Sequence, residues 1–404
     1  MHLTHTTIAE SPLGPDRVRL SGHVRYDQGT PPAETYWFDV PVEYRDSLSS
    51  SGNPWLVCLA PLAVSLGEPL KIVDPVDPLL LKNVRGLVKL WKNWYPGLHL
   101  VPIEAPNVAA VRAAGPRRTG AFFSGGVDAF FTVLRHQDPI EGWDHLPIDD
   151  LIFIWGLDVS IDKPDAFDRT RQALQSAAKE LGKNLVVVAS NLKNTRLERD
   201  AEWGALWHGS GIVSTGLALE KQYAQLVIAS TYSYANLAPW GSHPLSDPLL
   251  STLSTRVIHD DVSFSRTEKT EVVARSDMAL RTLRVCWNAR SERNCSYCNK
   301  CFRTMATLEV LGALDRCPQF DRTRLSLDAL SRLFSGDHND RILLLEVRDL
   351  ALRKGRSDIA EAIDRSLTRS RRMRKWVSLA MWLGRQPYVW RWGRPLLQRL
   401  RLVF

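Results

Sequence analysis

Apolar and polar residues alternate in two short stretches near the start of the chain, at residues 17–25 and 35–42. Alternation with a period of two is typical of strands that bury one face. An apolar run at 54–66 and a segment with apolar residues at helical spacing, 79–94, come next. We therefore expect residues 1–115 to form a separate N-terminal α+β domain.

From residue 119 onward, short apolar runs alternate with segments of helical spacing. The runs have the length of buried strands and lie at 119–123, 151–157, 185–189 and 226–229. The helix expected at 164–181 begins with proline and is followed by Gly182. Strands that alternate with helices predict a doubly wound α/β domain, in which helices cover both faces of a parallel sheet. We place this domain at residues 116–315.

The end of the chain differs from the rest in its charge. Helical spacing between 300 and 364 predicts a helical extension over residues 316–364. Residues 365–404 then hold 11 of the 52 Lys and Arg and no Asp or Glu. The first 364 residues therefore carry 41 basic and 44 acidic residues, a net charge of −3, although the whole chain carries +8. A body so close to neutral argues against nucleic-acid binding by the body itself.

The overall composition is that of a globular protein. A hydrophobic fraction of 44% with 24% charged residues excludes wholesale disorder. No apolar run approaches the roughly 20 residues of a membrane-spanning helix. The first residues also lack the apolar core of a secretory signal. We therefore expect a cytoplasmic protein.

Residues 122–128, FFSGGVD, join a strand to a helix through a glycine-rich turn. The two glycines allow a tight turn that brings backbone N–H groups close to an anion, and the helix N-terminus adds positive partial charge. A serine hydroxyl can donate to a phosphate oxygen, and an aspartate can orient the loop or hold Mg²⁺. The pattern predicts a phosphate-binding loop made by Ser124, Gly125, Gly126, Val127 and Asp128. A plain strand–turn–helix connection is the alternative.

Four of the six cysteines lie within sixteen residues and form a second motif, at Cys286, Cys295, Cys298 and Cys301. In a reducing compartment such crowding points to a metal and not to disulfides. Four thiolates suit a closed tetrahedral zinc site, which stabilises the local fold. An iron–sulfur cluster and the absence of a metal are the alternatives. Cys58 and Cys317 lie outside the pattern and are interpreted as core residues.

The two motifs together resemble a known enzyme family. SGGVD, Ser124–Asp128, resembles the SGGxDS signature of the PP-loop ATP pyrophosphatases, with Ala129 in place of the final serine. A four-cysteine cluster after such a loop is similar to 7-cyano-7-deazaguanine synthase, the QueC-type branch. SRTE, residues 265–268, resembles the S-K-x-E motif of that branch, with arginine in place of lysine. Three further segments resemble it, at 209–220, 226–230 and 301–314, so that the resemblance covers roughly residues 119–315.

The resemblance implies a PP-loop, HUP-like fold and an ATP-dependent ligase that forms a C–N bond. A carboxylate or amide oxygen would be adenylated with release of pyrophosphate, and a nitrogen nucleophile, ammonia in that family, would displace AMP. ATP, Mg²⁺ and Zn²⁺ are the implied cofactors, with a small carboxylate and ammonia as partners. Arg266 would act beside Ser124 and Asp128 as a catalytic residue. Gly156 and Asp158, at the end of the second buried strand, would contact the nucleotide.

Other functions stay open at this point. A PP-loop enzyme of tRNA thiolation would have a basic body and a cysteine available as sulfur carrier, and neither is evident. A component of a defence or modification system that attaches a deazapurine to a macromolecule would suit the additional domains. A non-catalytic ATP-binding interaction protein is the third alternative, and Ala129 is the argument for it.

Several further residues have a functional and an ordinary interpretation. Lys269, close to Arg266, could meet phosphate or lie on a solvated helix face. The long loop at 232–250 contains Trp240, His243 and Asp247 and follows a buried strand, where ligands of α/β proteins bind. His208 could begin a helix near the nucleotide. Ordinary packing is the alternative for each of these side chains.

The basic tail, residues 365–404, has Trp residues between its arginines. Such a segment could lie on an anionic membrane surface or bind nucleic acid, the latter being the less expected. It could also dock on a partner protein or on the slightly acidic body. Whether the chain forms a homodimer is a further open point.

Overall fold

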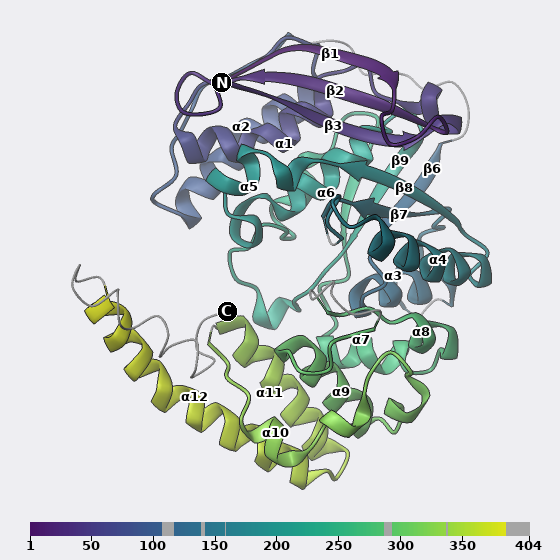
Figure 1. Cartoon of the computed structure of the whole chain (residues 1–404), viewed down its shortest axis with the longest axis vertical. Coiled ribbons are helices and arrows are strands. Elements are labelled where there is room, and N and C mark those ends of the chain that lie inside the picture. The colour runs from purple at the N-terminus through teal and green to yellow at the C-terminus, as the bar shows by residue number, and fades with distance from the viewer. Residues whose placement is uncertain (107–116, 139–141, 158, 287–292, 337, 385–404) are drawn as a thin grey trace. The chain divides into compact units, whose positions relative to one another are not determined.

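The computed structural model describes residues 1–106, 117–138, 142–157, 159–286, 293–336 and 338–384, with side chains up to residue 373. The chain divides into two compact units, residues 1–292 and 293–404, which are considered one at a time (Figure 1). The first unit is an α/β structure built on a mixed, largely parallel sheet, and the second is helical. The predicted α/β class and the helical C-terminal region are therefore confirmed.

Ten strands within the described residues form one sheet, in the order β10-β9-β6-β7-β8-β3-β2-β1-β4-β5. Their bounds are β1 (His2–Glu10), β2 (Arg17–Arg25), β3 (Ala33–Pro41), β4 (Leu70–Ile72), β5 (Ile103–Glu104), β6 (Arg118–Phe122), β7 (Asp150–Trp155), β8 (Asn184–Ser190), β9 (Tyr223–Ala229) and β10 (Arg256–Asp260). The strands that were expected from alternation or apolar runs are all present, whereas β1, β4 and β5 were not expected.

The parallel part of the sheet reverses its direction of growth beside β6. The chain passes from β6 to β7 and β8 on one side, and then returns to add β9 and β10 on the other side, with every pair parallel. Such an order creates a switch point between β6 and β9, and α/β proteins bind ligands outside the carboxyl ends of the strands at this point. The fold therefore directs attention to the loops that follow β6 and β9.

The N-terminal strands extend this sheet instead of forming a sheet of their own. β1, β2 and β3 are antiparallel neighbours, and β3 pairs with β8 through Phe38–Ser190 and Asp39–Ala189. The side chain of Asn191 adds two hydrogen bonds, accepting from the N–H of Trp37 at 2.9 Å and donating to the carbonyl of Thr35 at 2.8 Å. We expected a separate domain over residues 1–115. Strand alternation reports which face is buried, not which strand lies alongside, so this pairing could not be seen in the pattern.

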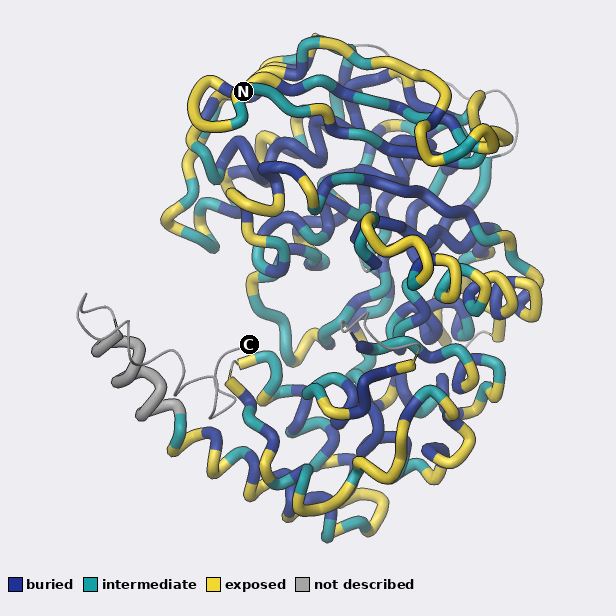
Figure 2. The backbone as a smooth tube through the Cα atoms, viewed as in Figure 1, coloured by how far each residue is buried: buried dark blue, intermediate teal, exposed yellow. Residues whose placement is uncertain are grey.

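The helices differ in how they are buried, as Figure 2 shows for the buried α1 and the exposed outer face of α4. In the first unit they are α1 (Asn53–Leu66), α2 (Pro78–Trp94), α3 (Val127–Gln137), α4 (Pro164–Glu180), α5 (Arg196–Asp200), α6 (His208–Leu217), α7 (Arg266–Val273) and α8 (Asp277–Thr282). The second unit contains α9 (Asn299–Val310), α10 (Leu327–Ser331), α11 (His338–Arg353) and α12 (Ser357–Gly384). A π-helical turn, η3 (Trp203–Trp207), leads into α6.

Short 3-10 turns complete the connections, at η1 (Val42–Ser47), η2 (Leu192–Asn194), η4 (Tyr234–Asn236), η5 (Asp247–Leu250), η6 (Leu314–Arg316) and η7 (Arg322–Arg324). In the second unit α12 packs against α10 and α11. It runs without interruption through residue 364, where we expected the helical extension to give way to a separate tail. Among the helices in the described part of the chain, none is both long and apolar enough to cross a membrane.

Helix α1 links the N-terminal segment to the α/β part of the sheet. Its residues from Asn53 to Val64 are all buried, and it packs against α6. A helix that is enclosed on every side needs no polar face, which explains why its sequence is an apolar run without helical periodicity. One continuous hydrophobic core contains residues of α1 and α2 together with residues of β6 to β10.

A buried carboxylate reinforces the same junction. Glu220 lies just beyond α6, is 2% exposed, and accepts hydrogen bonds from the hydroxyls of Ser49 and Ser51 at 2.5 and 2.6 Å. The side-chain amide of Asn53, the first residue of α1, donates to its other oxygen at 2.7 Å. A buried carboxylate is stable only when it is satisfied in this way. The cluster therefore fixes the start of α1 against the end of α6.

Replacing Glu220 with Gln should destabilise the protein, because the amide removes the charge and turns one acceptor into a donor facing Asn53 or the serines. We expect the free energy of unfolding to fall by about 1–3 kcal/mol, measured by urea denaturation. Glu180→Gln is the matched control: its carboxylate pairs with Arg281 but is 49% exposed. Exposed pairs contribute less than about 1 kcal/mol. Equal effects of the two substitutions would contradict a special role for Glu220.

Candidate functional site

The turn between β6 and α3 has the backbone geometry that anion-binding loops require. Gly125 has a φ of +76°, and a side chain there would strike Leu174, with Cβ only 2.7 Å from its Cδ2. Gly126 is the N-cap residue of α3, and no side chain caps this helix. Its N–H donates to the hydroxyl oxygen of Ser124 at 3.4 Å, which leaves the hydroxyl proton of Ser124 available to another acceptor.

The first turn of α3 presents its amides at the same place. The initial N–H groups of a helix lack partners within the helix, and those of Val127, Asp128 and Ala129 have no acceptor among the described residues. Val127 is 1% exposed and Ala129 6%, so each could offer a ligand only its backbone. The loop and the helix start together form a cradle of N–H donors for an anion.

Asp128 stands in this first turn and faces a cation from another helix. Arg266, the first residue of α7, lies with its guanidinium nitrogen 2.9 Å from Asp128 Oδ2. Thr231, which follows β9, donates its hydroxyl to the same oxygen at 3.5 Å. The other oxygen, Oδ1, is buried and has no hydrogen bond within the described residues. A buried carboxylate oxygen without a partner fits a hard cation such as Mg²⁺.

The residues of the SRTE motif have two different roles, capping of a helix and contact with Asp128. Ser265 and Glu268 form a capping box: the hydroxyl of Ser265 accepts from the N–H of Glu268, and the carboxylate of Glu268 accepts from the N–H of Ser265 at 2.7 Å. These outer positions therefore serve to start α7. Arg266 is the residue of the motif that the helix start turns toward Asp128.

Lys269, one turn further along α7, occupies a more central place than its sequence pattern indicated. It is 1% exposed, and its ammonium donates to the carbonyl and the hydroxyl of Ser230 at 2.7 and 2.6 Å. No acceptor for its third proton lies among the described residues. Burial lowers the pKa of Lys269, and the negative charge of Asp128 opposes that shift. A solvated helix face, the ordinary interpretation, is therefore wrong, since buried lysines require a specific environment.

A second group of charges lies behind this pair, at the end of β10. Asp260 accepts from Thr132 at 2.9 Å and from His136 at 3.1 Å, and it pairs with Arg135. Burial alone would raise the pKa of Asp260, but the hydrogen bonds from His136 and Arg135 lower it to about 2. The N–H of Leu146 donates to His136 Nδ1 at 3.0 Å, so the ring donates to Asp260 from Nε2. These contacts fix α3 against β10 and so hold the first turn of α3 in place.

Gly156 ends β7 on the other side of β6. It has a φ of +104°, and a Cβ there would lie 1.9 Å from the carbonyl oxygen of Ser190 in β8. Glycine is needed for this close backbone approach. Asp158, which we expected to contact the nucleotide, lies outside the described residues.

The long loop after β9 is organised by one of its own residues. Asp247 is fully buried and accepts from Ser242, from the N–H of His243 and from His259 Nδ1, at 2.6, 3.2 and 2.8 Å. The ring of His243 packs edge-on against Trp94, and burial lowers its pKa, with His259 adding to the effect. Asp247 and His243 are thus explained by loop packing.

The aromatic residues of the same region form a separate cluster. Trp240 lies edge-on to Tyr232, with ring centres 6.4 Å apart, and packs against Gly204 in the π-helical turn. His208 contacts Trp203, with ring centres 4.7 Å apart. Within the described residues, the ring contacts of Trp240 and His208 are thus with Tyr232 and Trp203.

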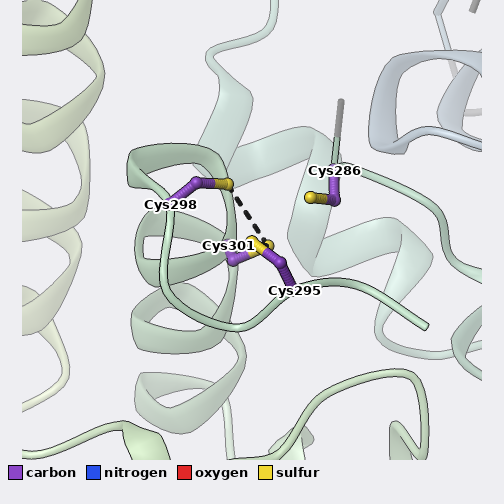
Figure 3. Close-up of side chains that lie close together, drawn as sticks. All are labelled: Cys286, Cys295, Cys298 and Cys301. Carbon is purple, nitrogen blue, oxygen red and sulfur yellow. Dashed lines mark hydrogen bonds between the residues drawn. The ribbon is translucent and has the colours of Figure 1, made fainter. Parts of the chain in front are cut away.

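The four cysteines of the second motif lie together (Figure 3). Their sulfur atoms are all within 4.8 Å of one another, with Cys298–Cys301 at 3.5 Å and Cys295–Cys301 at 3.6 Å. A tetrahedral zinc site with bonds of about 2.3 Å places its sulfurs about 3.8 Å apart. The cluster could therefore bind a metal such as zinc.

The backbone around the cysteines supports the same arrangement. Cys298 is the N-cap of α9 and Cys301 lies in its first turn, where the helix dipole favours thiolates. Ser296 turns the chain between Cys295 and Cys298 with a φ of +61°, and its hydroxyl accepts from the N–H of Asp321 at 2.9 Å. Cys58 and Cys317 are buried elsewhere, and burial raises the pKa of the Cys317 thiol to about 11.

Comparisons with protein-family models, with curated proteins and with solved structures found no match for this chain.

Elemental analysis of the purified protein should find about one zinc atom per chain, because four thiolates fill a tetrahedral site. Cys301→Ser should lower the zinc content to well below one and reduce the melting temperature. Cys58→Ala, which removes a buried cysteine outside the cluster, should retain the zinc. Iron with visible absorbance, or full zinc content in Cys301→Ser, would contradict the tetrathiolate zinc site.

Proposed function

We propose that this protein is an ATP-dependent enzyme of the PP-loop, QueC-like type, which adenylates a small carboxylate and lets a nitrogen nucleophile, ammonia, displace AMP. The observation that carries the proposal is the ion pair between Asp128 and Arg266 at the switch point of the sheet. It places a carboxylate and a cation beside a glycine turn and an uncapped helix start. Phosphoryl transfer needs these same groups.

The first step of the proposed reaction is nucleotidyl transfer. A carboxylate oxygen of the acceptor attacks the α-phosphorus of ATP, and the bond from that phosphorus to the bridging oxygen breaks. The bridging oxygen keeps the electron pair and leaves with pyrophosphate. Ser124 and the amides at the start of α3 would donate to phosphate oxygens, where negative charge accumulates. Bound Mg²⁺ would neutralise part of the phosphate charge, with Asp128 Oδ1 as its protein ligand.

The two cations of α7, Arg266 and Lys269, would have different roles. In the structure Arg266 is 26% exposed and is neutralised by Asp128, so an arriving polyphosphate can compete for its guanidinium. Lys269 is fixed by Ser230 and cannot move with the ligand. We therefore assign Arg266 to the phosphates and Lys269 to positioning of the Ser230–Thr231 backbone beside Asp128.

In the second step, ammonia attacks the acyl carbon of the acceptor. The bond from this carbon to the phosphate-bound oxygen breaks, AMP leaves with the electron pair, and the nitrogen releases a proton to water. The four cysteines would hold a zinc ion without an open coordination position, so the role of this site in the proposal is structural. The acceptor would be held by the loop after β9, whose second residue, Thr231, contacts Asp128.

Asp128→Asn tests the proposed function. With ATP, ammonia and a panel of small carboxylates including carboxy-deazapurines, we expect release of AMP and pyrophosphate to fall by at least 100-fold. Circular dichroism should show an unchanged fold, since Asp128 is partly exposed and lies at a helix start. The matched control is Asp165→Asn, which alters an exposed aspartate in the first turn of α4 and should keep full activity. Normal turnover of Asp128→Asn, or no AMP and pyrophosphate from the zinc-loaded wild type, would refute the proposal.

Lys269→Met tests the role of the buried ammonium. Methionine fills similar space, so the desolvation cost of the charge disappears along with its hydrogen bonds to Ser230. We expect a change in the free energy of unfolding of less than about 2 kcal/mol, but a drop in pyrophosphate release of about 100-fold. Lys179→Met, on the exposed face of α4, should change neither quantity. Full activity of Lys269→Met would show that the lysine is a structural group only.

A further inference from the structure

The charged end of α12 carries a feature that the proposed enzyme does not use. One face of this helix is buried in the second unit: Ser366 and Ser370 are fully buried and donate to the carbonyl of Leu333 at 2.8 and 3.4 Å. The rest of the helix surface exposes four arginines, which we call the basic surface, Arg365, Arg369, Arg371 and Arg372. The buried serines fix the direction in which the basic surface points.

A groove accompanies the basic surface. It opens between α10 and α12 with a volume of about 900 Å³, and four arginines and one acidic residue line it: Arg332, Arg365, Arg369, Arg372 and Asp364. Arg369 donates to the carbonyl of Arg332 at 2.7 Å, which keeps its side chain against the groove wall. Several guanidinium groups along one groove form a suitable seat for phosphate groups.

Little negative charge within the second unit opposes these arginines. Arg365 pairs with Glu361, and Asp364 pairs with Arg348 at 2.7 Å. Arg369, Arg371 and Arg372 have no ion pair with any described residue. No acidic residue follows Asp364 in the sequence. Three exposed and uncompensated cations on adjacent turns favour an anionic partner.

The sequence that follows the basic surface indicates which class of anionic partner, a membrane or a nucleic acid, this surface binds. Within α12 the residues at 376–384, WVSLAMWLG, are apolar except for one serine and include two tryptophans. Nine residues are too few to cross a bilayer but suffice to enter its interface. Aliphatic residues such as those at 377, 379 and 383 have no counterpart in single-stranded nucleic-acid sites, which use aromatic stacking. Tryptophan beside basic residues is typical of the headgroup region of membranes.

We propose that the basic surface of α12, with the apolar segment at 376–384, binds the surface of an anionic lipid bilayer. The arginines contact lipid phosphates and carboxylates, and the apolar segment enters the boundary between headgroups and acyl chains. Binding of this kind is reversible, because neither part alone holds a protein on a membrane. The proposal concerns where the protein acts and is independent of its reaction.

Flotation of the full-length protein with lipid vesicles tests the proposal. We expect binding to phosphatidylcholine vesicles that contain about one third phosphatidylserine, and little binding to phosphatidylcholine alone. The triple variant R369Q/R371Q/R372Q should bind roughly 100-fold more weakly. Trp376→Ala combined with Trp382→Ala should also weaken binding, and rising salt should weaken the wild type.

Two controls keep the result interpretable. K163Q/R169Q/K179Q removes three exposed cations around α4 and should leave vesicle binding unchanged, which separates a local surface from net charge. R371Q/R372Q removes two of the cations without breaking a hydrogen bond to any described residue, so it serves if the triple variant has a lowered melting temperature. Equal binding by wild type and R371Q/R372Q would overturn the proposal. So would stronger binding to single- or double-stranded DNA than to anionic vesicles, lost in the same variants.

Discussion

The parallel pairing of β6 with β9 is the constraint on which the candidate site depends. Because these neighbours run in the same direction, the turn at Ser124–Gly126 and the residues Ser230 and Thr231 leave the sheet at one edge. The chain has placed β7 and β8 on one side of β6 before β9 arrives on the other. The loops after β6 and β9 therefore diverge, and α/β proteins bind ligands at such a point.

The side chains at this edge form a nearly balanced set of charges. Asp128, Asp260 and Asp261 face Arg135, Arg266 and Lys269, and most of these groups are buried. Each buried charge costs solvation, which its partners must offset. Contacts with Asp260 and Ser230 hold two of the cations, whereas Arg266 reaches Asp128 at the more open side. Arg135 and Lys269 are thus held in fixed positions, whereas the ion pair of Arg266 with Asp128 can be exchanged for a ligand. A preorganised site for an anion requires this combination.

Local pattern predicted most elements of the fold but not their neighbours. β2, β3 and the parallel strands from β6 to β9 agreed with their alternation or apolar runs. The short strands β4 and β5 were missed, and so was β1, because Leu3 is the only buried residue between His2 and Glu10. The β3–β8 pair joins residues about 150 positions apart, and no local rule encodes such a partner. The same holds for Glu220, whose partners at Ser49, Ser51 and Asn53 lie far away in sequence.

The sequence predicted those parts of the candidate site whose residues are close together along the chain. The loop at 124–128 and the four cysteines are of this kind. Lys269 was underrated because burial at a helix start depends on the strands beneath it, here through Ser230. For Asp247 in the loop at 232–250, the sequence left a functional and an ordinary interpretation open. Its carboxylate accepts four hydrogen bonds that shape the loop, which favours the ordinary one.

The capping box at the start of α7 has a consequence for how the site can vary. Ser265 and Glu268 satisfy the helix start between themselves, so the backbone position of residue 266 does not depend on its own side chain. A lysine or an arginine can therefore project from the same point toward Asp128 with no change in scaffold. The length of the side chain at position 266 and its number of hydrogen-bond donors can therefore change without a change in the fold. A single substitution at this position would then alter which ligands the site prefers.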